Sequence, residues 1–256
     1  MIYTGIKKNY LILFLIIFIL IINIEICHAN EANSTATTNP VRRVVLLELF
    51  VQANCSTCPH VEFCLEDMFW EYGSEKIILL EEHLWGDGYD IEETNNRYDW
   101  YVGESKRGTP DLFINGLNER IQGLACKDLG ENYDYYKKVI DSEAVKCASI
   151  KLSAIKCISN SVIIIEGQVE NISIPSFEDL AICGMVYLEG EEPGLSYLVR
   201  DIFSFQDLPL FLPGNEIDYK FISEPLITEE NMGKLHAVVF VQNLVTKEVL
   251  QAVYVE

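Results

Sequence analysis

Positive charge is scarce in this sequence. Lys and Arg together number 19 against 39 Asp and Glu, which gives a formal net charge of −20 at neutral pH. Nucleic acid phosphates repel such a chain, and no basic block offsets the acidic residues, so we exclude DNA and RNA as partners. The acidic balance also favours solubility.

Long apolar runs are scarce too. The N-terminal run covers only residues 11–22 and follows two lysines, a length typical of a signal-peptide core and short for a membrane span. A cleavage site is available after Ala29, so we expect residues 1–29 to be a signal peptide or an N-terminal anchor. Residues 11–26 would provide the anchor if the segment is retained. In both cases the folded part is exported, to the periplasm or the extracellular space.

The sequence after residue 148 lacks convincing helical periodicity and has no Trp, since all three Trp residues precede it. Short strand-like segments follow one another there, separated by Pro and Gly. This pattern predicts that residues 148–256 form an all-β sandwich of immunoglobulin type, although the core Trp of true immunoglobulin domains is missing. The predicted strands are residues 150–158, 162–169, 180–188, 217–222, 235–242 and 248–255.

The preceding part alternates strand and helix patterns. Residues 30–41 are rich in Asn, Ser, Thr and Ala and are predicted to be a disordered spacer. An α/β domain is predicted over residues 42–147, beginning with a strand buried on both faces at residues 44–51. The helix at residues 59–72 has the clearest apolar face of the chain. The further predicted elements are a strand at 76–84, a helix at 91–102, a hairpin at 111–121 and a helix at 128–146.

Eight cysteines are present, and Cys55 and Cys58 form a Cys-x-x-Cys motif between the first strand and the first helix. Haem attachment would need His directly after the second cysteine, and structural zinc would need a second pair of ligands. At the helix N-terminus, the partial positive charge stabilises a Cys55 thiolate, whereas the helical period turns Cys58 inward. We therefore predict that Cys55 attacks and Cys58 resolves. The alternative is an inert structural disulfide.

The remaining cysteines leave several pairings open. Cleavage after Ala29 removes Cys27 and leaves an odd number, so at least one thiol is unpaired or intermolecular. Cys64 lies close to the core face of its helix and is predicted to be a buried thiol. Three connectivities are possible if the other four all pair; these are Cys126, Cys147, Cys157 and Cys183.

Two further features lie where they could assist the cysteine pair. Glu48 is the ionisable residue of an otherwise apolar strand, so it is either a neutral buried acid that exchanges protons with Cys58 or a partly hydrated strand end. Pro110 opens a later strand and forces Thr109 into an extended conformation. A cis Thr109–Pro110 bond would expose the Thr109 backbone to an extended substrate, although most such bonds are trans.

Residues 45–65, 110–116 and 120–124 resemble the thioredoxin superfamily, in particular exported bacterial thioredoxin-like proteins, some of them described as outer-membrane proteins. The resemblance covers residues 43–147. It implies that Thr109 and Pro110 form the cis-proline loop beside Cys55, and that Glu48 takes the place of the buried acid. The sequence departs from thioredoxin in two ways. Glu48 lies seven residues before Cys55, one more than in thioredoxin, and the acidic, aromatic stretch 85–108 is longer than thioredoxin needs.

These observations favour an extracytoplasmic thiol–disulfide oxidoreductase that exchanges disulfides with protein thiols, with a membrane redox partner as a further expectation. The redox-active disulfide would itself carry the electrons, so no cofactor is expected. Two alternatives stay open. His83 ends the second strand, and with Cys55 and Cys58 it could bind copper as in Sco-type chaperones, although those proteins space their cysteines by three residues. The other alternative is a redox-silent binding module.

Overall fold

The structure is a computed structural model. It describes residues 41–255 except for residues 104–106, 127–130, 160, 191–194, 226–227, 229–230 and 232. The predicted signal peptide or anchor and nearly all of the predicted spacer lie outside the described residues. Among the helices that are described, none is both long enough and apolar enough to cross a membrane. The segment Arg42–Glu256 forms one compact unit.

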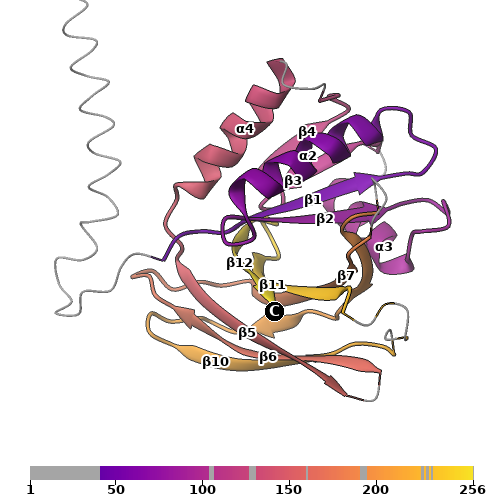
Figure 1. Ribbon diagram of the computed structural model, residues 1–256. Coiled ribbons are helices and arrows are strands. Elements are labelled where there is room, and N and C mark those ends of the chain that lie inside the picture. Colours follow the sequence, from indigo (N-terminus) through magenta and orange to yellow (C-terminus); the bar gives the residue numbers. More distant parts are fainter. Residues whose placement is uncertain are drawn as a thin grey trace, which may run out of the picture. The chain divides into compact units, whose positions relative to one another are not determined.

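The first part of the chain alternates strands and helices in the predicted order (Figure 1). Predicted and observed boundaries agree to within about three residues. The elements are β1 (Val45–Val51), α2 (Cys58–Tyr72), β2 (Ile77–His83), α3 (Glu92–Val102), β3 (Asp111–Ile114), β4 (Glu119–Gln122) and α4 (Glu131–Ala144).

Strand β1 lies at the centre of this part. It pairs in parallel with β2 and antiparallel with β3, and β3 pairs antiparallel with β4. Every residue of β1 and of β2 is buried, which agrees with the prediction of a strand covered on both faces. Successive side chains of a strand point to opposite faces, so β1 presents Leu47 and Leu49 to one face and Leu46, Glu48 and Phe50 to the other.

The second part consists of strands, as predicted. Two of them, β8 and β9, were not predicted from the sequence; β9 has only three residues. The strands are β5 (Ile150–Ser159), β6 (Val162–Asn171), β7 (Leu180–Leu188), β8 (Leu198–Ile202), β9 (Gln206–Leu208), β10 (Glu216–Ile222), β11 (Leu235–Asn243) and β12 (Val249–Val255).

The two parts share one sheet. Its main path runs β12-β11-β7-β8-β2-β1-β3-β4, β9 pairs with β7, and a separate three-stranded sheet has the order β10-β6-β5. The ladder that joins the parts within this sheet is short, because β2 pairs with β8 only through Glu81 and Leu198. The molecule is therefore a mixed α/β protein, which confirms the fold class at this level.

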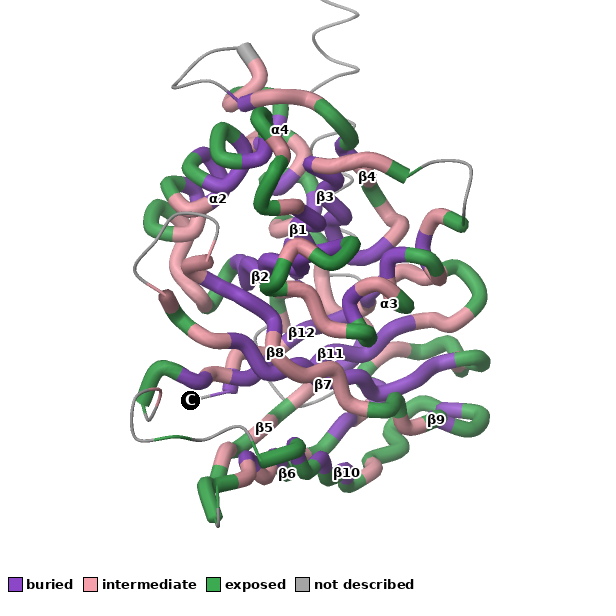
Figure 2. The backbone as a smooth tube through the Cα atoms, turned by 90° about the vertical axis from the view of Figure 1, so that its right-hand side faces the viewer, coloured by how far each residue is buried: buried purple, intermediate pink, exposed green. Residues whose placement is uncertain are grey.

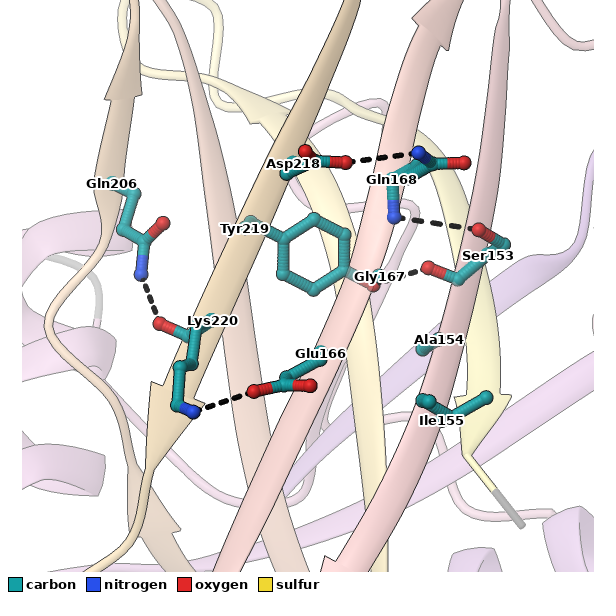
Figure 3. A pocket seen from close by; sticks show the side chains of 10 residues that line it. All are labelled: Ser153, Ala154, Ile155, Glu166, Gly167, Gln168, Gln206, Asp218, Tyr219 and Lys220. Carbon is teal, nitrogen blue, oxygen red and sulfur yellow. Dashed lines mark hydrogen bonds and ion pairs between the residues drawn. The ribbon is translucent and has the colours of Figure 1, made fainter.

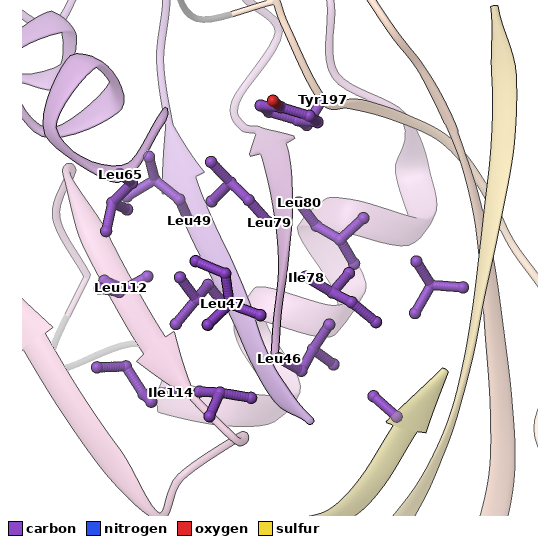
Figure 4. Close-up of a cluster of buried hydrophobic side chains, with 14 of the residues drawn as sticks. Leu46, Leu47, Leu49, Leu65, Ile78, Leu79, Leu80, Leu112, Ile114 and Tyr197 are labelled. Atoms are coloured by element: carbon purple, nitrogen blue, oxygen red, sulfur yellow. The ribbon is translucent and has the colours of Figure 1, made fainter. Parts of the chain in front are cut away.

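Hydrophobic side chains also cross from one part to the other. Leu47, Leu65 and Ile78 belong to the same buried cluster as Tyr197 from the segment before β8 (Figure 4). Phe240 of β11 belongs to this cluster too. A second cluster fills the space between β5-β6-β10 and the strands β7 and β11. Figure 2 shows the buried positions concentrated in β1, β2, β7, β11 and β12. Division of the chain into folding units at residue 148 stays a prediction.

The β3–β4 turn of the first part packs against the β11–β12 turn of the second part. The hairpin turn at Asn115 and Gly116 has positive φ at both residues, which fits the predicted Asn-Gly turn. Gly116 lies against the β11–β12 turn, where a Cβ atom would be 1.9 Å from the carbonyl oxygen of Lys247. The amide of Val249 donates to the carbonyl of Asn115 at 3.0 Å. Glycine is thus required both by the backbone conformation and by this close approach.

Candidate redox site

Cys55 and Cys58 form a disulfide at the start of α2, with their Cα atoms 5.5 Å apart. Cys58 is 1% exposed and belongs to the main core, whereas Cys55 is half-buried and is followed by exposed residues. The Cys58 amide donates to the Cys55 sulfur at 3.1 Å. This sulfur therefore receives one of the amide donors that a helix N-terminus leaves without an internal partner, which is the environment that stabilises a thiolate.

A second disulfide corrects the prediction that Cys64 is a buried thiol. Cys64 is bonded to Cys126, 62 residues later, and both are buried. Helical periodicity placed Cys64 near the core correctly, but it carries no information on the segment after β4 that supplies its partner. Cys147 is also disulfide-bonded. Cys157 is an exposed thiol and Cys183 is a buried one.

The Thr109–Pro110 bond is cis, as the resemblance implies. It lies at the same edge of the sheet as the cysteine pair, because Asp111 pairs with Phe50 and β1 ends one residue later, just before the cysteine turn. Tyr98 fixes the loop: its hydroxyl accepts from the Gly108 amide at 2.9 Å and donates to Asp111 at 2.8 Å.

Asp111, which follows the cis-proline loop, is also bound by Arg120. Arg120 of β4 binds its carboxylate through Nε at 2.9 Å. Burial raises the pKa of Asp111, while hydrogen bonds from Arg120 and Tyr98 oppose that increase. Sequence reasoning did not single out Tyr98, Asp111 or Arg120. The Asp that directly follows Pro110 in an apolar strand was the available signal.

Glu48 is completely buried, which excludes the partly hydrated strand end. It faces α3: Arg97 donates to one carboxylate oxygen, and the Tyr101 hydroxyl donates to the other at 2.8 Å. Arg97 also donates to Gln242 of β11 at 3.1 Å. Cys58 lies over the opposite face of the sheet with the apolar side chains of α2. Proton exchange between Glu48 and Cys58 stays a prediction.

Glu82 of β2 lies beside Glu48 on this same face and is completely buried. Burial, followed by the charge of Glu48, raises the pKa of Glu82 well above its usual range, and the charge of Arg97 opposes the increase. Burial therefore favours the neutral form of Glu82, whereas the Glu48 carboxylate is the group that pairs with Arg97.

A second group of acids lies on the α2 face. Glu62 of α2 and Glu81 of β2 are 4% and 0% exposed. Burial raises the pKa of Glu62 to about 7, with a lowering contribution from the charge of His83 and a raising one from Glu66. Burial likewise raises the pKa of Glu81 to about 8, although the Tyr197 amide donates to this carboxylate at 3.0 Å. These two acids were not predicted as site residues.

His83 connects this group to the cysteine turn. Its Nδ1 lies 2.6 Å from Asp87 Oδ2, the same oxygen that accepts from the Ala53 amide at 2.8 Å. Burial opposes ionisation of Asp87, but hydrogen bonds from His83, Tyr89 and Ala53 lower its pKa overall. His83 is therefore held near the cysteine turn, as predicted from its place at the strand end. Within the described residues, no group of three or more His, Cys, Asp or Glu side chains could hold a metal ion.

An open groove crosses the three-stranded sheet, and none of the predicted redox residues lines it (Figure 3). Its polar side chains pair with one another: Gln168 donates to Asp218 at 2.9 Å, and Tyr219 donates to the Ser153 carbonyl at 2.6 Å. The Tyr219 ring lies across Gly167, where any Cβ atom would be 2.5 Å from the Tyr219 hydroxyl.

No family model matches the sequence, and no curated protein matches it. Among solved structures, HBP35 of Porphyromonas gingivalis aligns with a TM-score of 0.60 at 15% identity, over 84% of this chain and 75% of that chain. A domain of the outer membrane lipoprotein Omp28 from the same organism aligns with a TM-score of 0.32 at 18% identity, over 43% of this chain and 88% of that domain. The first alignment shows that most of this chain shares its fold with HBP35.

Proposed function

We propose that this protein is an exported, thioredoxin-like thiol–disulfide oxidoreductase that exchanges disulfides with protein substrates through Cys55 and Cys58. The disulfide across the N-terminus of α2 carries the proposal, since it joins a half-buried sulfur to a buried one. The cis Thr109–Pro110 bond at the same sheet edge supports a role for these two residues in binding an extended substrate.

The fold and the second disulfide support the remaining parts of the proposal. Strand order β2-β1-β3-β4 with α2 after β1 is the arrangement that the resemblance to thioredoxin implies. Packing of β5-β6-β10 against β7 and β11 fits an immunoglobulin-like sandwich. Disulfides persist in oxidising compartments, so the buried Cys64–Cys126 bond supports export to the periplasm or the extracellular space.

In the reducing direction, the Cys55 thiolate attacks a substrate disulfide, forms a mixed disulfide and releases the first substrate thiolate. Cys58 then loses its proton and attacks the Cys55 sulfur. The Cys55–Cys58 bond forms, the second substrate sulfur leaves as a thiolate, and both substrate thiolates take up protons. Two electrons pass from the cysteine pair to the substrate. The oxidising direction is the same sequence in reverse.

Single cysteine variants test the proposal. Cys55→Ser should abolish reduction of insulin by the dithiothreitol-reduced protein, and Cys58→Ser should accumulate a mixed disulfide, because no thiol remains to resolve it. Cys157→Ser is the matched control, since Cys157 is an exposed thiol outside the pair. A further measurement is alkylation rate against pH, with a lower midpoint for Cys55 than for Cys58. Equal rates for the wild type and Cys55→Ser would contradict the proposal.

The copper-carrier alternative is tested by titrating the reduced protein with Cu(I), alongside His83→Ala. Exchange requires a thiolate, a resolving thiol and access, so His83→Ala should leave insulin reduction within about threefold of wild type. A copper site that used His83 with Cys55 and Cys58 would lose affinity severely when one of three ligands is removed. Tight stoichiometric copper binding that disappears in His83→Ala, without insulin reduction, would favour the carrier. If the protein neither bound copper nor reduced insulin, the redox-silent module would be favoured.

A further inference from the structure

We propose that Glu62, rather than the strand acid Glu48, is the general base that accepts the proton of the Cys58 thiol. This inference rests on the proposed exchange reaction and assigns the residue that enables its second step. Four observations carry it: the position of Glu62 on α2, the face of the sheet that it shares with Cys58, the charges around it, and the commitment of Glu48 to Arg97.

The helix itself brings Glu62 to Cys58. Both residues lie in α2, four positions apart, and both are buried, at 4% and 1% exposure. Side chains four residues apart lie one above the other on a helix, with their Cβ atoms about 6 Å from each other. A glutamate side chain spans that separation directly or through one water molecule, which is the reach that a general base needs.

The register of β1 and β2 places the other groups. Leu49 pairs with Glu81 and Val51 with His83, so Glu81 and His83 point to the α2 face together with Glu62. Phe50 pairs with Glu82, and these two point to the α3 face with Glu48. The sheet therefore separates Glu48 and Glu82 from the buried sulfur of Cys58.

The charged neighbours of Glu62 are His83 and Glu81 on β2 and Glu66 on its own helix. The segment before β8 supplies neutral donors to two of these carboxylates: the Ser196 hydroxyl donates to Glu66 at 2.7 Å, and the Tyr197 amide donates to Glu81. The pKa of Glu62, raised to about 7 chiefly by burial, lets this carboxyl both accept and release a proton near neutral pH.

Glu48 has the opposite environment. Arg97 and the Tyr101 hydroxyl donate to its two oxygens. Glu48 is the counter-charge of the buried Arg97 guanidinium, so its carboxylate is committed to the α3 face and turned away from Cys58.

The proton step completes the exchange reaction. In the mixed disulfide, the Glu62 carboxylate takes the proton from the Cys58 sulfur, and the resulting thiolate attacks the Cys55 sulfur. The bond between Cys55 and the substrate sulfur breaks, the Cys55–Cys58 bond forms, and the substrate leaves as a thiolate. The protonated Glu62 then gives its proton to that thiolate or to water, which restores the carboxylate.

Two-phase release of thionitrobenzoate tests the assignment. The protein carries Cys157→Ser and is reduced at Cys55 and Cys58. It is then mixed with one equivalent of dithiobis(nitrobenzoate). The first phase reports attack by Cys55, and the second reports resolution by Cys58. We expect Glu62→Gln to slow the second phase about tenfold or more near pH 7 and to leave the first phase unchanged. The pH midpoint of the second phase should rise toward that of an unassisted thiol.

Three further variants make the result specific. Glu62→Asp keeps a carboxylate and should restore part of the second phase. Glu82→Gln, the matched control, removes a buried acid on the other face and should change neither phase. Glu48→Gln tests the competing assignment, and its folding is checked by thermal unfolding. A slowed second phase in Glu48→Gln, with normal phases in folded Glu62→Gln, would overturn the inference. Absence of a second phase in the parent would instead overturn the proposed exchange reaction itself.

Discussion

The two faces of the β1–β2 pair both bury carboxyl groups, yet they hold them differently. On the α3 face, Glu48 is paired with a guanidinium, and burial raises the pKa of Glu82 beside it. On the α2 face, Glu62 and Glu81 lie near an imidazole, and burial raises the pKa of both. One face thus holds a fixed charge, whereas the other holds acids that titrate near neutral pH. A buried acid is suited to proton transfer only where no permanent counter-charge fixes its ionised form.

The largest expected effect comes from removing the counter-charge on the α3 face. Arg97→Met should lower the free energy of unfolding by about 3–5 kcal/mol, because it leaves the buried Glu48 carboxyl without its counter-charge. The apolar Met still packs against Phe240, whose ring lies 5.1 Å from the Arg97 guanidinium. Urea denaturation at neutral pH measures this loss. Arg107→Met serves as a control, because Arg107 and Asp99 form an ion pair that is partly exposed to solvent.

A double variant separates charge from packing. Glu48→Gln added to Arg97→Met removes the orphaned carboxylate, so it should recover part of the lost free energy of unfolding. If the double variant were less stable than Arg97→Met alone, Glu48 would be stabilised by groups other than Arg97, and the contrast between the two faces would fail.

The α2 face should respond to pH. In the folded protein the pKa values of Glu62 and Glu81 are about 7 and about 8, above the usual 4.5. The native state therefore binds more protons than the unfolded state between about pH 4.5 and pH 8. The contribution of these two acids to the free energy of unfolding is fully present below about pH 4.5. It is lost as the pH rises through 7 to 8. Between about pH 5 and pH 8, we therefore expect the free energy of unfolding to decrease as the pH rises.

Paired substitutions identify the source of that loss. Glu62→Gln with Glu81→Gln should flatten the dependence of the unfolding free energy on pH, measured by urea denaturation at about pH 5, 6.5 and 8. Gln keeps an oxygen that can accept the Tyr197 amide, so the variant preserves this hydrogen bond of Glu81. An undiminished slope in the double variant would show that other groups, such as Glu82, account for the dependence.

The elements that carry a strong local pattern could be predicted from the sequence. The continuous apolar run of β1 and the 3–4 spacing of α2 specify a buried strand and an amphipathic helix almost without reference to the rest of the chain. β9 has three residues and takes its conformation from its pairing with β7, so it leaves little local signal. The narrow connection between β2 and β8 is a tertiary contact that no local pattern encodes.

The part of the site that residues close together in the sequence form could be predicted. Cys55 and Cys58 are three residues apart, and their disulfide follows from a turn and a helix start. Glu48 was singled out as a candidate buried acid, but its partner Arg97 lies 49 positions away. Arg97 in turn binds Gln242, which lies 145 positions from Arg97. Only the register and the packing show which face Glu48 occupies. Glu62 was less conspicuous, because a glutamate in a helix is ordinarily exposed.

The smallest effect is expected for Glu82→Gln. A protonated glutamic acid and a glutamine are both neutral and have nearly the same shape, so the free energy of unfolding should change by less than about 1 kcal/mol at neutral pH. Because the pKa of Glu82 is raised in the folded protein, the stability that this acid contributes is lost as the pH rises through the folded pKa. Glu82→Gln should therefore lose less stability than wild type in alkaline solution. Urea denaturation at about pH 7 and pH 9 measures both quantities. A loss at pH 7 as large as that of Arg97→Met would mean that Glu82 is ionised and shares Arg97 with Glu48. The α3 face would then hold two charges rather than one, and its contrast with the titrating α2 face would have to be redrawn.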